Sequence, residues 1–347
     1  MTDVAAPAAP GDSPPVLERG WWRVGVGMAL FLLLPLTPLL RILLPVDQTL
    51  VLLAPALAAS ALVGWWAGGR LPLAVMWSAL AVWVLWQFTA GEGTVASLLC
   101  GWAVLLAASF GAIGLIEQRG ARRPLLTRAL LAISLTALLA LGSALLVPHG
   151  VASVEEALRL EVSRRGTEAV TDWQQQVRSP KWRELAAQQP FADSLATQLE
   201  QQLTAAPATA LTLFPALLAL ESLAALALAW AVYHRVGRER LGPPLAALRD
   251  FRFSDHMVWG LIAGLLLVVS GMAQLTGIGA NLLLFFGVLY ALRGVGVVLW
   301  FLAPGRLVMA LLIGTAVLFW YVLGVFALGV GVGDTWLDWR RRVRAKT

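Results

Sequence analysis

Long apolar runs recur along the chain, separated by short segments that hold glycine, proline and charged residues. A run of about 20 apolar residues can cross the hydrocarbon core of a bilayer as an α-helix. The sequence lacks the alternating, turn-punctuated pattern of an outer-membrane barrel. It therefore predicts an all-α polytopic transmembrane helical bundle of about eight or nine spans, at residues 24–44, 50–66, 71–88, 95–116, 125–147, 208–233, 256–272, 279–303 and 307–328.

Residues 149–206 interrupt this pattern with a polar stretch that carries charges of both signs. Ser153 and Glu156 form a capping-box pattern that opens a helix, and Ser179 and Pro180 start another. Apolar stripes at helical spacing mark two more helices, at Val170, Trp173 and Val177 and at Phe191, Leu195, Leu199 and Leu203. We predict a helical insert, either a cap on the bundle or a partner-docking module.

The chain thus divides into five parts. An Ala- and Pro-rich tail at 1–20 is predicted to be disordered, and spans one to five follow at 21–148. The polar helical insert occupies 149–206 and spans six to nine occupy 207–332. Residues 333–347 form a basic interfacial tail, which a flexible glycine-rich segment introduces and for which Asp334 is expected to provide a cap.

Composition supports a membrane protein and excludes several other classes. Of the 347 residues, 59% are hydrophobic and 13% are charged, whereas about a quarter of a soluble chain is charged. The single Cys100 excludes an internal disulfide and a cysteine-based metal cluster. The three histidines lie at separate span ends, so no metal site is predicted. The net charge of +6 suits topology and anionic lipid headgroups, and no nucleic-acid partner is expected.

Basic loops set the expected orientation in a bacterial cytoplasmic (inner) membrane. Lysine and arginine favour the cytoplasmic side, so the N-terminus and the loops at 117–123 and 234–253 are placed there. The polar insert is then extracytoplasmic. Nine crossings put the C-terminus outside, yet the basic segment 338–346 favours the cytoplasm. One span is therefore miscounted, either the proline-broken first span or the span that contains Arg293.

Two ionisable residues fall near the middle of predicted spans, Glu221 in span six and Arg293 in span eight. A lone charge at that depth is costly, so a mutual pair is the economical hypothesis. The pair would either hold the bundle together or form part of a substrate, proton or ion site. Tyr290 shares a helical face with Arg293 and Asn281 opens the same span, so these four residues are the candidate substrate-binding residues.

The glycine-containing segment 277–281 resembles a phosphate loop only superficially, because no strand precedes it and no lysine follows at the required spacing. We interpret it as a tight turn, with Asn281 as the helix cap. No set of residues suggests covalent catalysis, so the protein is not expected to be an enzyme and no cofactor is predicted. Any energy coupling would require a separate ATPase module.

Short motifs near the end of the chain carry a family resemblance: NLLLFFGVLY at 281–290, RGVGV at 293–297, GD at 333–334 and DWR at 338–340. Over about 255–342 the chain resembles the YybS-like family of uncharacterised bacterial predicted membrane proteins. That family is distantly similar to the substrate-binding membrane components of energy-coupling-factor transporters. The resemblance implies a bundle that binds a small molecule and relies on an ATPase subunit or acts alone.

Two functions follow from these observations. In the first, the protein is a transporter-like membrane component that binds a small solute within the bundle, with Glu221 and Arg293 in the site. In the second, it is a membrane scaffold or assembly factor that acts through its polar insert and basic tail. The lipid bilayer is a partner in both, and a small-molecule substrate, an ATPase module or another membrane protein is the further partner.

Overall fold

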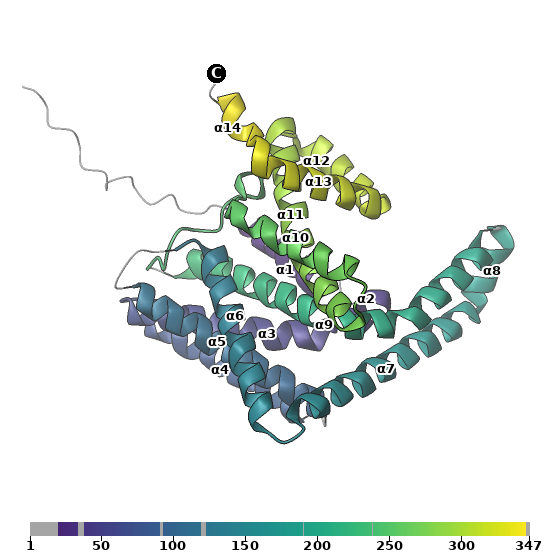
Figure 1. Cartoon of the computed structure of the whole chain (residues 1–347), viewed down its shortest axis with the longest axis horizontal. Coiled ribbons are helices and arrows are strands. Elements are labelled where there is room, and N and C mark those ends of the chain that lie inside the picture. Colours follow the sequence, from purple (N-terminus) through teal and green to yellow (C-terminus); the bar gives the residue numbers. More distant parts are fainter. Residues whose placement is uncertain are drawn as a thin grey trace, which may run out of the picture.

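The computed structural model describes residues 20–33, 38–90, 93–118, 123–189, 191–237 and 239–344 (Figure 1). All regular structure in these residues is helical, which confirms the predicted all-α class. The predicted disordered tail, Pro35 in the first span and most of the loop at 117–123 lie outside the described residues.

Within the described residues, six helices are long and apolar enough to cross a membrane. They are α3 (Val46–Trp66), α4 (Leu71–Ala90), α5 (Thr94–Glu117), α6 (Leu125–Leu146), α9 (Ala192–Val236) and α11 (Ala273–Leu302). A seventh span results if α12 (Arg306–Leu318) and α13 (Trp320–Leu337), which are bent by 109° at their junction, are counted as one. The chain is thus a multi-pass membrane protein.

Two of the predicted spans form shorter helices. The first consists of α1 (Trp21–Leu33) and the six-residue α2 (Pro38–Leu43). The predicted span at 256–272 is α10 (Val258–Val269), whose 12 residues extend about 18 Å, less than the hydrocarbon thickness. These two segments account for the difference between the predicted count and the observed one.

Helix α3 lies at the centre of the N-terminal half. In the 18-residue apolar stretch of α3, 78% is buried inside the protein, whereas only 11% of the corresponding stretch of α4 is buried. The main core combines buried side chains from α3, α5, α6 and α9, with Trp230 and Phe110 stacked edge to face at 6.1 Å. Helix α4 is therefore the lipid-facing element of this half, and α3 is its packed interior.

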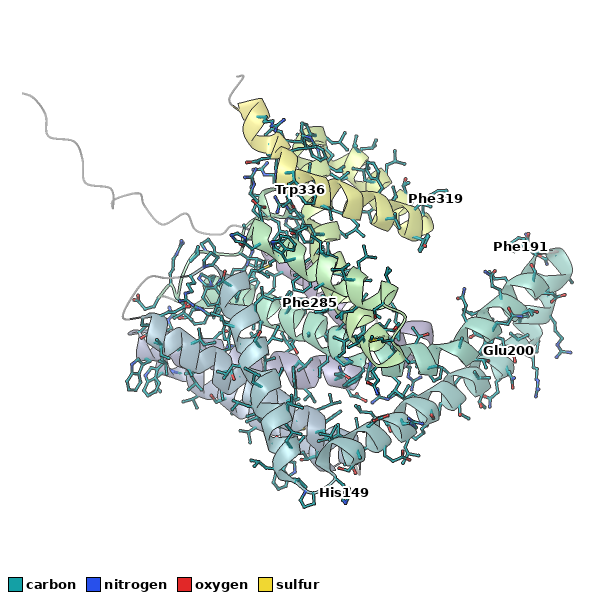
Figure 2. All side chains as sticks on the ribbon, in the orientation of Figure 1. His149, Phe191, Glu200, Phe285, Phe319 and Trp336 are labelled. Carbon is teal, nitrogen blue, oxygen red and sulfur yellow. The ribbon has the colours of Figure 1, made fainter. Side chains whose placement is uncertain are left out.

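The polar insert forms an arm that projects from the bundle (Figure 1). It comprises α7 (Gly150–Val177), α8 (Pro180–Gln188) and the first half of α9. Instead of four separate helices, the first two predicted helices merge into α7, and the fourth merges with span six into α9. At 45 residues α9 is about 68 Å long, so it continues well beyond a bilayer. Figure 2 shows His149 at the start of this arm and Phe191 and Glu200 along it.

Close backbone contact and aromatic packing hold the arm together. A Cβ atom on Gly166 of α7 would lie 2.3 Å from the ring of Pro207 in α9, so only glycine allows this approach. Trp173 donates its indole N–H to the carbonyl of Ala196 at 3.3 Å and stacks on Trp182 at 5.3 Å. The arm therefore has its own small core.

Glycines also determine how the C-terminal helices pack. Gly260 and Gly264 of α10 allow close contact with α11, because added Cβ atoms would meet Phe286 at 2.3 Å and the carbonyl of Gly279 at 3.0 Å. Gly279 lies inside α11, so the predicted turn at 277–281 is wrong. Between α11 and α13, a Cβ on Gly294 would lie 1.8 Å from the carbonyl of Ala327. The flexible exit predicted around 329–333 is instead part of α13.

Candidate functional site

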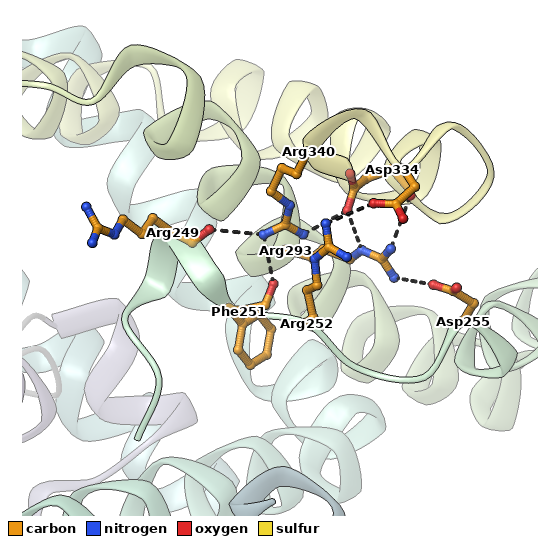
Figure 3. A network of polar contacts seen from close by, with 8 residues as sticks. Arg249, Phe251, Arg252, Asp255, Arg293, Asp334 and Arg340 are labelled. Carbon is orange, nitrogen blue, oxygen red and sulfur yellow. Dashed lines mark hydrogen bonds and ion pairs between the residues drawn. The ribbon is translucent and has the colours of Figure 1, made fainter. Parts of the chain in front are cut away.

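The guanidinium of Arg293 is buried between α11 and α13, but it does not pair with Glu221 as hypothesised. Its Nε donates to Asp334 Oδ2 at 3.0 Å, and its Nη1 donates to Asp255 Oδ1 at 2.8 Å. Figure 3 shows these contacts. Arg293 is 4% exposed and Asp334 is 0% exposed, so the desolvated cation has an equally desolvated partner. Asp334, expected as a helix cap, is the buried anion of this cluster.

A second arginine completes the cluster from the C-terminal tail. Arg340, in α14 (Trp339–Arg344), donates from Nη2 to Asp334 Oδ2 at 2.8 Å. Its Nη1 donates to the carbonyls of Arg249 and Phe251, at 3.0 and 3.3 Å. The basic tail is thus fastened to the loop before α10, rather than lying free at an interface.

Charges in this cluster cancel. Arg252 donates to Asp338 at 2.8 Å, so three arginines face three aspartates across the loop, α11 and the chain end (Figure 3). The ring of Phe253 lies under Arg293, 5.5 Å from its guanidinium carbon, and stacks on Tyr290 at 4.9 Å. Tyr290 is fully buried in this packing. Among the described residues, Asp334 Oδ1 and Arg340 Nε have no hydrogen-bond partner. We still interpret the cluster as an ion network that joins helices, because each of its six charged groups has a partner of opposite sign.

Glu221 has a different partner. Gln48 Nε2 of α3 donates to Glu221 Oε2 of α9 at 2.6 Å, and both side chains are buried. Glu221 Oε1 and Gln48 Oε1 have no hydrogen-bond partner among the described residues. In the next position of α9, Ser222 accepts a hydrogen bond from the indole of Trp102 at 3.0 Å. The Glu221 carboxyl therefore joins α9 to the central helix α3.

The side chain of Asn281 bonds to the backbone of α9 instead of capping its own helix. Pro215 lies inside α9 and disturbs its backbone hydrogen bonds. The side chain of Asn281, eight residues into α11, accepts from the backbone N–H of Ala216 at 2.9 Å. It also donates to the carbonyl of Thr212 at 2.7 Å. Its amide thus bonds both the N–H of Ala216 and the carbonyl of Thr212 beside Pro215 and connects α11 to α9.

A cavity of about 1100 Å³ lies elsewhere, between the arm and the membrane helices. The start of α3, the end of α4 and the start of α5 meet at one end of the bundle, where α2 and α7 cover them. Its apolar wall consists of Leu50, Val51, Trp83, Val84, Phe88 and Leu99. Its charged wall consists of Arg41, Asp47, Glu161, Arg164, Arg165 and Glu168. The cavity therefore combines a membrane-level apolar surface with a charged surface outside it.

Most of these charges already have partners within α7. Arg164 binds Glu161 at 2.7 Å and also pairs with Glu168, and Arg165 binds Glu161 at 2.8 Å. The hydrogen bond from Arg164, reinforced by the charges of both arginines, holds the pKa of the Glu161 carboxyl below its usual range, and burial opposes it. The side chain of Asp47 takes part in no hydrogen bond or ion pair within the described part of the chain. Arg41 has one exposed contact, to Asp172 at 3.7 Å.

None of the four predicted site residues is in this wall. Glu221 is linked to the wall only through Gln48, which follows Asp47 in α3. Arg293, Tyr290 and Asn281 belong to the packing of the C-terminal helices.

Sequence reasoning did not single out Asp47, Gln48, Asp255 or Arg340. Asp47 stands just before an apolar run, and this position at the edge of a predicted span is the sequence feature that could have marked it as a site residue. Arg128, also missed, is 1% exposed and donates to Glu117 at 2.6 Å. Its guanidinium lies 4.7 Å from the ring of Trp230. As in the Arg293 cluster, each charge of this pair has a partner of opposite sign, so the pair joins α5 to α6.

Comparison with known proteins places part of the chain in a family context. Residues 181–335 match a family described as "Predicted membrane protein (DUF2232)". The match starts within α8 and ends within α13, so it includes Glu221, Asn281, Tyr290, Arg293 and Asp334. It does not include α2 to α7, which form the cavity wall. No curated protein and no solved structure is significantly similar to the chain.

Proposed function

We propose that this membrane protein binds a small amphipathic solute in the cavity between its arm and its membrane helices. The proposal rests on the division of the cavity wall into an apolar part and a charged part. Apolar side chains come from the ends of α3, α4 and α5, and charged side chains come from α2, the first turn of α3, and α7. Ligand cavities typically measure about 300–1,000 Å³ and combine an apolar lining with a few polar groups. This cavity, of about 1100 Å³, is slightly larger than that range and has the same mixed lining.

In this proposal the protein is the solute-binding component of a transport system in a bacterial cytoplasmic membrane. The resemblance to YybS-like proteins, and through them to energy-coupling-factor components, supports this class. The sequence holds no phosphate loop, so a separate ATPase subunit supplies the energy. The arm lies on the extracytoplasmic side, where it meets the solute first.

Filling the cavity tests the proposal. Ala157 of α7 lines the cavity, whereas Ala152 is exposed on the same helix and is not in the wall. Native mass spectrometry of the purified protein should detect a retained amphiphile. Ala157→Trp should lower its occupancy about tenfold or more, which corresponds to about 1.4 kcal/mol. Ala152→Trp should leave occupancy unchanged. A folded Ala157→Trp variant that retains as much amphiphile as the unchanged protein would contradict the proposal.

The arm also supports the second candidate, a scaffold or assembly factor. It projects from the bundle (Figure 1), and at its end Phe191 and Leu195 are 61% and 49% exposed. Deleting the arm would not separate the two functions, because α7 forms part of the cavity wall. Substituting Phe191 and Leu195 with serine does separate them. A scaffold should lose a membrane-protein partner in a pull-down while cavity occupancy stays unchanged.

A further inference from the structure

We propose that the ligand of this cavity is an aminophospholipid, an amphiphile whose headgroup carries one primary ammonium and one phosphate. The inference rests on the proposed function and identifies its solute class. It follows from which wall charges are free, from the depth at which they lie and from the chemistry that each would recognise.

The free charges are one anion and one cation. Glu161 and Glu168 are occupied by Arg164 and Arg165, all on α7. Asp47 has no partner within the described residues, and Arg41 has only its exposed contact with Asp172. A carboxylate in the first turn of a helix is favoured by the helix dipole, which explains why Asp47 is tolerated there. That effect does not explain why the carboxylate lines the same cavity as Arg41.

Each free charge suits one half of the proposed headgroup. The Arg41 guanidinium presents a planar fork of donors that matches a phosphate. The Asp47 carboxylate accepts charge-assisted hydrogen bonds, which a primary ammonium can donate. A trimethylammonium group has no N–H to donate and is recognised mainly by aromatic faces. A headgroup with only a phosphate would face Asp47 with like charge.

The depth of the wall residues suits a hydrocarbon chain attached to such a headgroup. Val51 lies four residues after Asp47 in α3, so it is about 6 Å further into the span. Trp83 and Val84 lie about 9–11 Å inside the end of α4 at Ala90. A lipid whose headgroup lies between Arg41 and Asp47 would therefore place its first methylene groups against these apolar side chains.

The test is a titration of the purified full-length protein in detergent, followed by native mass spectrometry. The probes are phosphatidylethanolamine, phosphatidylcholine and phosphatidylglycerol with identical chains. We expect phosphatidylethanolamine to bind about tenfold more tightly than phosphatidylglycerol, the factor that one charge-assisted hydrogen bond provides. Equal affinities for the three lipids would overturn the headgroup proposal. If none of the three lipids binds at the cavity, the aminophospholipid assignment is overturned, whereas the proposed function is decided separately by the retained amphiphile and the Ala157→Trp variant.

Two substitutions test which residue binds the ammonium and which binds the phosphate of the headgroup. Asp47→Asn should remove the advantage of phosphatidylethanolamine over phosphatidylcholine, and Arg41→Gln should weaken both. Asp193→Asn is the matched control, because Asp193 also lies in the first turn of a helix but outside the cavity wall. It should change no affinity. An unchanged lipid order in a folded Asp47→Asn variant contradicts the proposal.

A soluble competitor distinguishes a lipid from a free polar solute. Glycerophosphoethanolamine carries the same headgroup without acyl chains, so it lacks the contacts with Val51 and Trp83. We expect it to displace the lipid only at concentrations far above those of the lipid itself. Displacement at equal concentrations would show that the cavity binds the polar group alone, and would overturn the aminophospholipid assignment.

Discussion

The Arg293 cluster and the arm cavity hold similar numbers of charged residues but use them differently. In the cluster, Arg293 and Arg340 converge on the buried Asp334, and the loop before α10 covers them (Figure 3). In the cavity, Asp47 and Arg41 remain available at the edge of the membrane helices. Buried charges that saturate one another hold helices together, whereas unsaturated charges beside an apolar surface can recognise a ligand.

Removing the shared anion should have the largest effect on this comparison. Asp334→Asn leaves the buried Arg340 without a charged partner and leaves Arg293 with only the exposed Asp255, which is expected to cost about 3–5 kcal/mol of stability. Thermal unfolding of the purified variant measures this loss. Asp255→Asn is the control, because its side chain is 61% exposed and an exposed pair contributes about 0–1 kcal/mol. Equal effects of the two substitutions would show that the cluster is not a closed unit.

The contact between α11 and α13 offers the next test. Gly294→Ala places a Cβ against the carbonyl of Ala327, a backbone atom that cannot rotate away. Such overpacking is expected to cost about 1–3 kcal/mol. Gly287→Ala on the same helix meets nothing within 4 Å and should be neutral or stabilising. If Gly294→Ala is as stable as Gly287→Ala in thermal unfolding, the two helices do not pack as closely as described.

Glu221→Gln tests whether the buried carboxylate takes part in binding. Glutamine keeps an oxygen that can accept the hydrogen bond from Gln48, so the expected stability change is within about 1 kcal/mol. Because Glu221 is not in the cavity wall, amphiphile occupancy should also be retained. Loss of occupancy in a folded Glu221→Gln variant would show that the site extends beyond the wall to α9.

The smallest expected effect concerns acid stability of the arm. The pKa of Glu161 is lowered in the folded protein, so its ion pairs stabilise α7 above the carboxyl's unfolded pKa. This contribution is lost as the pH falls through the lower folded pKa. Hydrogen exchange of α7 should therefore accelerate below about pH 4. Glu161→Gln should remove that pH dependence, and an identical acid profile in the variant would contradict the assignment.

The sequence predicted the elements of the fold better than their partners. The apolar runs located α3, α4, α5 and α6 to within a few residues, since each is bounded by glycine, proline or charge. Asn281 was placed as a cap because glycines precede it, but Gly279 lies within a helix, where it packs closely against α10. The continuity of α9 was also missed, because proline usually ends a helix and here Asn281 compensates for Pro215.

The candidate site was harder to predict for a related reason. Glu221 and Arg293 stand out in apolar runs, and this made a mutual pair attractive. Their partners, Gln48 and Asp334, lie 173 and 41 residues away and occupy positions that resemble span edges or tails. Asp47 gave little signal, because an acidic residue at a helix start is common. Only the tertiary arrangement shows that α7 covers Asp47 and creates a cavity.

The most direct test of the central claim is an experimental structure of the full chain in a bilayer of native lipids. The account predicts elongated density in the cavity formed by α3, α4, α5 and α7, with its polar end between Arg41 and Asp47. Its apolar part should lie against Val51 and Trp83. A structure in which α7 packs directly onto α4 and α5, so that side chains fill this space, would contradict the account.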